Sequence, residues 1–153
     1  PCMESREYDA IVNLFTSFGY YDDETNETIL AQCRKHSREG AIFLIDVMNR
    51  DWLVENFEPR SFRRVEDRLF LEERSIDLPR GRMKNQWTIL QAAEDGDYRT
   101  EATIDLDHRI YTLHELVWLF DQTDWRFEEA YGSLTGAPFA MGARRIAAVF
   151  SGR

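Results

Sequence analysis

Small polar side chains gather where an apolar run near the N-terminus stops. The run Ile11 to Phe15 leads into Thr16, Ser17 and Gly19, and then into a series of acidic residues. Short side chains and glycine let a ligand approach the backbone closely, and aromatic side chains can wall it. The neighbouring aromatic residues are Phe15, Phe18 and Tyr20. We therefore expect a ligand site at this point of the chain.

A second polar group lies at the end of the apolar run "AIFLIDV", Ala41 to Val47, and consists of Asp46, Asn49 and Arg50. These side chains lie at the carboxyl end of a predicted strand, where open α/β sheets bind ligands. A simpler interpretation is that Asn49 caps a short helix through its side-chain oxygen while Arg50 faces solvent. Both interpretations stay open at the level of sequence.

The histidines suggest a metal site only at first sight. His108 and His114, with Asp107 and Glu115 beside them, are residue types that bind zinc. However, Glu115 lies three residues after Thr112, which is the spacing of a helix capping box. His108 and His114 also straddle a strand–helix junction instead of sharing one face. We predict no metal site.

Hydrophobic periodicity predicts the elements that position these residues. Tyr8 to Leu14 and Ala41 to Val47 are short, nearly continuous apolar runs, which is typical of strands buried on both faces. A helix capped by Asp22 or Asp23 separates them. Strand, helix and strand in this order predict a parallel pair with a right-handed crossover, as in an α/β sheet.

The middle of the chain has a different pattern. Tyr98 to Leu106 alternates apolar and polar residues, and Arg68 to Asp77 and Arg82 to Leu90 also favour strands. We expect an antiparallel sheet over Phe62 to Leu106 with one face in water. We interpret Arg60 to Arg68 as one basic strand whose arginines are ion-paired with nearby acids, or alternatively attract an anionic substrate.

The C-terminal part returns to α/β character. The capping box at Thr112 predicts a helix that ends near Phe120. A strand over Trp125 to Tyr131, with Trp125, Phe127 and Tyr131 on one face, and a last buried strand over Arg145 to Phe150 follow it.

Composition limits the function classes. The chain has 153 residues, a net charge of −9 and 43% hydrophobic residues. This charge disfavours binding to nucleic acid or to anionic membranes, which need positive charge. No apolar run approaches the length of a membrane-spanning helix. Two distant cysteines, Cys2 and Cys33, favour a reducing compartment, and we expect the cytoplasm.

Two blocks of sequence carry a family resemblance. The blocks "NLFTSFGY" and "LIDVMNRD" resemble the fourth and fifth strand ends of class I S-adenosylmethionine-dependent methyltransferases that act on small molecules. The run "YTLHELVWLF" and the terminal "RRIAAVF" are similar to the last helix and closing hairpin of that family. The resemblance implies an α/β fold, namely the C-terminal half of a Rossmann-like methyltransferase sheet with an antiparallel β lid insertion. It implies one partial domain, with a core over 1–57 and 107–153 and a lid over 58–106.

The resemblance also implies roles for individual residues. Leu14, Phe15, Thr16 and Ser17 would bind the cofactor, S-adenosylmethionine. Phe18, Tyr20, Asn49 and Arg50 would bind the substrate, a small-molecule methyl acceptor. His108, Arg109 and Tyr111 lie where the lid rejoins the core, so they would be candidates for substrate contact or for a general base.

One part of the family pattern has no counterpart. No glycine-rich turn follows a strand, and no acidic residue ends a strand in the place that holds the cofactor ribose. We therefore expect the chain to need an N-terminal half for activity. Pro1 could mark a truncation or follow a removed initiator methionine. The bare edge of the strand at Tyr8 to Leu14 would pair with that missing half or with a second copy of the chain.

Two other functions stay open. The chain could be a non-catalytic half-domain that serves as a binding or assembly module. It could also be a nucleotide-binding fragment of an oxidoreductase, because the fold alone does not define the activity.

Overall fold

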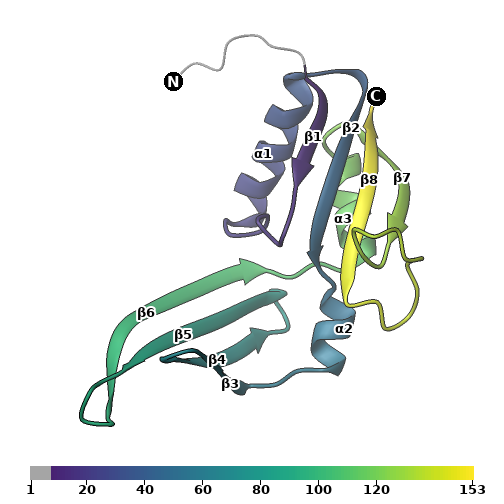
Figure 1. Ribbon diagram of the computed structural model, residues 1–153. Coiled ribbons are helices and arrows are strands. Elements are labelled where there is room, and N and C mark those ends of the chain that lie inside the picture. Colours follow the sequence, from purple (N-terminus) through teal and green to yellow (C-terminus); the bar gives the residue numbers. More distant parts are fainter. Residues whose placement is uncertain (1–7) are drawn as a thin grey trace. The chain divides into compact units, whose positions relative to one another are not determined.

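A computed structural model describes residues 8–153, which form two compact units. An α/β unit contains the segments up to Glu55 and from Arg109 to Arg153. An antiparallel unit contains Asn56–His108. Figure 1 shows the elements of both units along the chain.

The α/β unit is built on a four-stranded sheet in the order β1-β2-β8-β7. Strands β1 and β2 are parallel and are joined by helix α1, whereas β8 runs antiparallel to both of its neighbours. The predicted parallel pair is therefore confirmed. The strands are β1 (Tyr8–Asn13), β2 (Ser37–Met48), β7 (Trp125–Tyr131) and β8 (Arg145–Gly152), and the helices are α1 (Asp23–Lys35), α2 (Arg50–Glu55) and α3 (Leu113–Asp121).

Side-chain caps fix the starts of the two longer helices. The Asp22 carboxylate accepts a hydrogen bond from the backbone N–H of Thr25 at 2.8 Å, and so caps α1. Thr112 and Glu115 form the predicted capping box at the start of α3, with bonds of 3.2 and 2.8 Å. Each cap satisfies backbone N–H groups that have no partner within the helix.

The core lies on one face of this sheet. Phe43 and Ile45 of β2 pack with Leu30 of α1 and with Leu116 and Phe120 of α3. Aromatic rings dominate the contacts: Phe120 stacks on Phe150 at 3.8 Å between centroids, and Phe43 meets Trp125 edge-on at 5.3 Å.

The opposite face of the sheet is less covered. Val12 of β1 pairs with Leu44, and Ala10 pairs with Ile42. Val12 is 58% exposed and Ile42 is 40% exposed, although both are apolar. Among residues 8–153, β1 pairs with no strand other than β2, so this apolar face borders a strand edge that has no partner there.

Strand β7 contains an irregularity that the sequence pattern did not reveal. Its register against β8 shifts between Phe127 and Glu129, so Phe127 pairs with Phe150 and Tyr131 pairs with Ala147. Opposed residues share a face, and Phe150 and Ala147 face opposite ways along β8. The prediction that Trp125, Phe127 and Tyr131 share one face is therefore wrong for Tyr131, because a bulge reverses the alternation.

The antiparallel unit is a four-stranded sheet in the order β3-β4-β5-β6. The antiparallel sheet expected over Phe62 to Leu106 is confirmed, and its last strand extends to the junction with the α/β unit. The strands are β3 (Arg60–Val65), β4 (Arg68–Asp77), β5 (Arg82–Ala92) and β6 (Tyr98–Arg109).

The predicted single basic strand Arg60 to Arg68 is corrected to two strands. β3 ends at Val65, and Glu66 adopts a left-handed backbone with φ 54°. Val65 then pairs with Arg68 across a two-residue turn, which reverses the chain. Charged turn residues within a charged run gave no periodic signal for this reversal.

Among the described residues, 8–153, no helix has both the length and the apolar character needed to span a membrane.

Candidate functional site

The turn after β1 is strained and fastened to the neighbouring strand. Phe15 and Thr16 both have left-handed backbones, with φ of 57° and 58°. The backbone N–H of Phe15 donates to the Asp46 carboxylate, and that of Thr16 donates to the Asp46 carbonyl, both at 3.0 Å. Two consecutive non-glycine residues in this conformation cost free energy, so these bonds are what hold the turn.

Asp46 and Arg145 form the support beneath this turn. The Asp46 side chain is 1% exposed, and Arg145 donates to its two carboxylate oxygens at 2.6 and 2.7 Å. Arg145 also donates to the Thr16 hydroxyl at 3.2 Å. Strands β1, β2 and β8 are thereby joined at one end of the sheet. Sequence reasoning missed Arg145, for which the only signal was an arginine directly before an apolar strand.

The four residues expected to bind cofactor form this turn. The Ser17 hydroxyl donates to the Leu14 carbonyl at 2.7 Å, which closes the turn locally. Phe15 is 79% exposed, so the turn presents a phenyl ring to solvent. The turn offers an aromatic surface and short hydroxyl side chains, and it carries no charge of its own.

The two aromatic candidates for substrate binding differ in exposure. Phe18 is 4% exposed and packs in the core, with its ring 5.7 Å from that of Tyr111. Tyr20 is 43% exposed. Phe18 therefore has a packing role, whereas the Tyr20 side chain is partly accessible from solvent.

Asn49 and Arg50 lie where β2 passes into α2. The Asn49 side chain accepts from the backbone N–H of Asp51 at 3.1 Å and donates to the Ala143 carbonyl at 2.7 Å. Asn49 thus caps α2 and fixes the loop before β8. Arg50 is half-buried and lies 3.8 Å from the Glu115 carboxylate.

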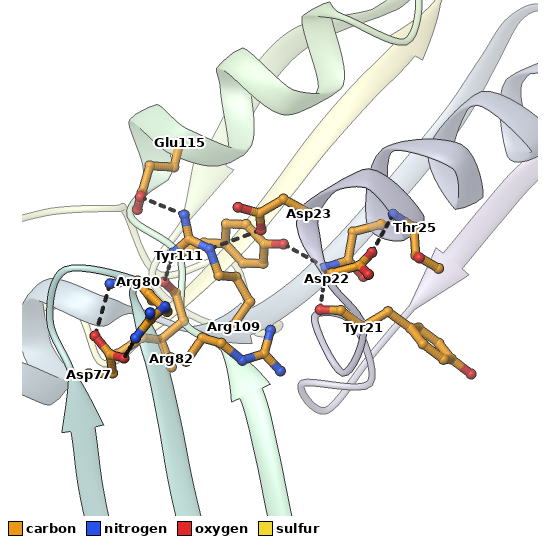
Figure 2. Close-up of polar contacts among 12 residues, drawn as sticks. Tyr21, Asp22, Asp23, Thr25, Asp77, Arg80, Arg82, Arg109, Tyr111 and Glu115 are labelled. Carbon is orange, nitrogen blue, oxygen red and sulfur yellow. Dashed lines mark hydrogen bonds and ion pairs between the residues drawn. The ribbon is translucent and has the colours of Figure 1, made fainter.

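Arg109 is the centre of a network at the start of α1 and α3 (Figure 2). Its guanidinium contacts Asp23 and Glu115, each at 3.1 Å, and lies 5.0 Å from the ring centroid of Tyr111. The Tyr111 hydroxyl accepts from the Asn26 amide at 3.2 Å. The network ties the ends of two helices to the segment that leaves β6.

The charge state of Arg109 excludes one of its expected roles. Burial lowers the pKa of this guanidinium, but the hydrogen bond with Glu115 and the charge of Asp23 outweigh burial, and the net pKa is raised. An arginine that stays protonated cannot act as a general base. Its contacts make it a residue that positions α1 and α3.

His108 belongs to the antiparallel unit, whereas Arg109 and Tyr111 belong to the α/β unit. His108 is 5% exposed. Burial lowers its pKa, and the positive charge of Arg82 lowers it further. The imidazole is therefore neutral at neutral pH, which is the form that can accept a proton.

The remaining reactive or charged residues give no sign of a second catalytic site in the described part of the chain. Burial raises the pKa of the Cys33 thiol, which disfavours the nucleophilic thiolate. No group of three or more His, Cys, Asp or Glu side chains in the described part of the chain could hold a metal ion. Several arginines of the basic region are ion-paired, as in the bonds Arg68–Glu101 and Arg82–Asp107 at 2.7 Å.

A groove runs between β1 and α1 in the α/β unit. Its volume is about 550 Å³, and Ala10 and Ile11 of β1 and Ile29 and Cys33 of α1 line it. Polar residues such as Thr28 and Gln32 also line the groove, but the surface that faces into it is almost entirely apolar.

No family model matches the chain, and no curated protein matches its sequence. Solved structures do match it. The CcbJ methyltransferase from Streptomyces caelestis superimposes with a TM-score of 0.83 at 15% identity, over 98% of this chain and 59% of that one. An S-adenosylmethionine-dependent methyltransferase from Clostridium acetobutylicum gives 0.82 at 12% identity, over 99% and 63%. CalS10, an amino pentose methyltransferase from Micromonospora echinaspora, gives 0.69 at 17% identity, over 97% and 59%.

The fold is therefore that of part of an S-adenosylmethionine-dependent methyltransferase, which confirms the predicted α/β fold class. Almost the whole chain is matched, but it spans only 59–63% of the length of these three structures. The sequence identities are low, so the likeness concerns the fold.

Proposed function

We propose that this chain is the C-terminal part of an enzyme that transfers a methyl group from S-adenosylmethionine to a small-molecule acceptor. The observation that carries the proposal is the strained turn at Phe15 and Thr16. It stands at the carboxyl end of β1, where open α/β sheets bind ligands. Strained backbone that the surrounding structure over-determines is typical of binding sites.

The turn fits one part of the cofactor. Leu14, Phe15, Thr16 and Ser17 would contact its methionine end, where the sulfur carries a positive charge. An exposed phenyl ring such as that of Phe15 attracts cations through its π face. The Ser17 hydroxyl already donates to the Leu14 carbonyl, and the Thr16 hydroxyl already accepts from Arg145 of β8, so both contribute shape more than charge. The cofactor, when bound, supplies the electrophilic methyl group.

The chain's own contribution to the reaction is positioning. Asp46 and Arg145 hold the turn in place, and Tyr20, Asn49 and Arg50 would contact the acceptor. Holding an acceptor in line with the methyl group supplies much of the rate enhancement of such a transfer.

We further propose that the remaining part of the domain pairs with the free edge of β1. The exposed side chains of Val12 and Ile42, together with the apolar groove over Ile11 and Ile29, are surfaces that a further strand and helix would bury. The solved structures that match extend well beyond the matched region, which supports this occupant. A second copy of the chain is the alternative outcome.

The partner proposal is tested by light scattering of the 153-residue chain and, in a separate sample, of its variant Ile29→Glu. If the groove is the pairing surface, the parent chain should either self-associate or bind an added N-terminal segment of the complete protein. The variant Ile29→Glu should lose this association. A monodisperse monomer that captures no such segment would contradict the proposal. Val54→Glu, at an exposed position on α2, is the matched control.

The catalytic proposal is tested by expressing the whole reading frame that contains the chain. Its product should bind S-adenosylmethionine in calorimetry and transfer radiolabelled methyl groups to small molecules in an extract. A product that does neither would leave the second candidate, a non-catalytic assembly module. The exposed apolar face of β1 and β2 is what favours that second function.

A further inference from the structure

Strand β3 forms one edge of the antiparallel unit, and its outer side pairs with no strand among residues 8–153. The sheet order β3-β4-β5-β6 places β3 at the end, beside β4 alone. Every residue of β3 except Ser61 is exposed to solvent. The edge of a sheet presents backbone N–H and C=O groups that can pair with another extended chain. The outer side of β3 is therefore a surface to which a strand can add.

The register between β3 and β4 identifies the backbone groups that point outward. Continued by one residue, this register places Pro59 opposite Arg74, whose backbone N–H donates to the Pro59 carbonyl at 2.8 Å. Bonded and non-bonded pairs alternate along an antiparallel ladder. Every second residue after Pro59 therefore bonds to β4, whereas the backbone groups of Arg60, Phe62 and Arg64 point to the free edge. An added strand needs outward groups at this spacing of two residues.

Two arginines of β3 form no ion pair within the described part of the chain. The Arg63 guanidinium lies over the ring of Phe70, 4.7 Å from its centroid. The Arg64 guanidinium lies over the ring of Tyr98 at 5.8 Å and donates to its hydroxyl. Arg60, in contrast, has an acidic partner at 2.9 Å. The edge thus carries two positive charges without a counter-charge, in a chain whose net charge is −9.

The placement of these two charges favours an extended peptide as the ligand. Arg63 and Arg64 are consecutive in a strand, so their side chains lie on opposite faces of the sheet. A ligand that lies on one face would meet only one of them. An added strand presents alternate side chains to both faces, and it can therefore place an acidic side chain beside each arginine.

An apolar row lies on the same face as Arg64. The β3–β4 and β4–β5 registers align Phe62, Leu71 and Thr88 across three strands. Phe62 is 75% exposed, and the three residues line part of a hollow of about 380 Å³. An apolar side chain on the added strand would extend this row beyond Phe62. The edge therefore fits a segment in which an apolar residue follows two acidic ones.

A second copy of β3 fits this edge poorly. In an antiparallel pair centred on Phe62, Arg60 of one copy would lie opposite Arg64 of the other. Like charges directly opposed across strands are destabilising. Charged side chains on an edge strand prevent pairing between identical edges, but they do not oppose a strand of the opposite charge.

We propose that the β3 edge binds an acidic, extended peptide segment of a partner protein, which extends the antiparallel sheet by one strand. Hydrogen bonds to the outward backbone groups would hold the segment, and Arg63 and Arg64 would select its charge. This surface is separate from β1 and its groove, and binding to it does not depend on methyl transfer.

The test is NMR hydrogen exchange of the 153-residue chain at low ionic strength, with a capped peptide of sequence valine-glutamate-glutamate-valine-threonine-threonine. Antiparallel to β3, this peptide places its glutamates beside Arg64 and Arg63 and its second valine beside Phe62. We expect saturable binding that slows exchange of the Phe62 and Arg64 amides. The Arg63 amide, which the register assigns to β4, should not change. A peptide with lysines in place of the glutamates should not bind.

Two pairs of variants separate charge from backbone pairing. Arg64→Glu should weaken binding about three- to tenfold, because an attraction across the edge becomes a repulsion. Arg80→Glu, at a 77% exposed side chain between β4 and β5, should leave binding unchanged. Phe62→Pro removes an outward N–H that the sheet does not use, and edge strands tolerate proline at such a position. It should therefore weaken binding more than Phe62→Val, which keeps the N–H.

Several results would overturn the proposal. They are absence of saturable peptide binding, binding that protects neither outward amide, and equal affinity of Phe62→Pro and Phe62→Val. Binding of single-stranded DNA as tightly as the acidic peptide would also overturn it. Protection of the Phe62 and Arg64 amides by a higher protein concentration alone would assign the edge to a second copy of the chain instead.

Discussion

The carboxylate of Asp46 accepts hydrogen bonds from two different groups. The guanidinium of Arg145 donates to it at 2.6 and 2.7 Å, and the backbone N–H of Phe15 donates to it at 3.0 Å. Asp46 of β2 and Arg145 of β8 are 99 residues apart in the chain. One buried ion pair therefore determines the shape of the turn at which we place the cofactor.

Replacing Asp46 with Asn should strongly destabilise the α/β unit. The substitution leaves Arg145 without its counter-charge and weakens the bond that holds Phe15. Breaking a buried pair in this way costs about 3–5 kcal/mol. Urea unfolding followed by tryptophan fluorescence measures the loss, because Trp125 lies in the core of this unit.

The matched control is Asp9→Asn, which breaks the exposed pair Arg38–Asp9 in the same unit. Exposed pairs contribute about 0–1 kcal/mol, so this variant should unfold almost as the parent does. Equal losses in the two variants would show that the Asp46–Arg145 pair has no special role.

Replacing Gly19 with Ala should destabilise the chain through a steric clash. A Cβ at this position would lie 2.8 Å from the Arg109 carbonyl oxygen, and φ is 102°. Gly40 also has a positive φ, of 73°, but a Cβ there meets nothing within 4 Å. Gly40→Ala thus reports backbone strain alone, about 1–3 kcal/mol.

Gly19→Ala should lose more unfolding free energy than Gly40→Ala, measured by urea titration with circular dichroism. It should also loosen the segment after β6, because Arg109 donates its backbone N–H to the Gly19 carbonyl at 2.7 Å. If Gly19→Ala and Gly40→Ala lost the same unfolding free energy, this would contradict a close approach between the backbones of Gly19 and Arg109.

Glu115 should make the stability of the α/β unit depend on acid pH. Burial raises the pKa of this carboxyl, but the Thr112 backbone N–H and the Arg109 guanidinium outweigh burial, and the net pKa lies below the ordinary 4.5. A depressed folded-state pKa gives stability that is present above 4.5 and is lost as pH falls through the folded-state value.

The measurement is the free energy of unfolding of the parent and of Glu115→Gln. It is made from neutral pH down to a pH below the folded-state pKa of Glu115. The parent should be more stable at neutral pH, and the difference should shrink as Glu115 becomes protonated. A difference that stayed constant over this range would contradict the assigned role of the carboxylate.

Replacing Phe15 with Ala should affect binding and not folding. The side chain is 79% exposed, so the unfolding free energy should change by less than about 0.5 kcal/mol. If the phenyl ring contacts the cofactor, the complete protein should lose about tenfold or more in affinity, because a buried phenyl contributes about 1.5–3 kcal/mol. Calorimetry measures this, with Leu134→Ala as an exposed apolar control.

Local patterns predicted the elements of this fold well. The apolar runs over Tyr8 to Leu14 and Ala41 to Val47 predicted a parallel pair, and the spacing of Thr112 and Glu115 predicted the capping box, because these features depend on neighbouring residues. The alternation from Tyr98 to Leu106 predicted an antiparallel strand for the same reason.

Local sequence patterns could not predict contacts between residues far apart in the chain. They also could not predict the single positions at which a strand pattern is interrupted. Arg145 reaches Asp46 only because β8 lies beside β2 in the folded sheet. The turn at Glu66 and the bulge after Phe127 are breaks in a repeating pattern, and a period carries no information about where it is interrupted. The network around Arg109 likewise joins helices far apart in the chain.

The most direct test of the central claim is calorimetric titration of S-adenosylmethionine into two proteins. One is the 153-residue chain, and the other is the product of the whole reading frame that contains it. We predict binding to the second and none of comparable strength to the first, because in our proposal the turn after β1 forms only part of the cofactor site. Absence of binding to both, or equally tight binding to the chain alone, would contradict it.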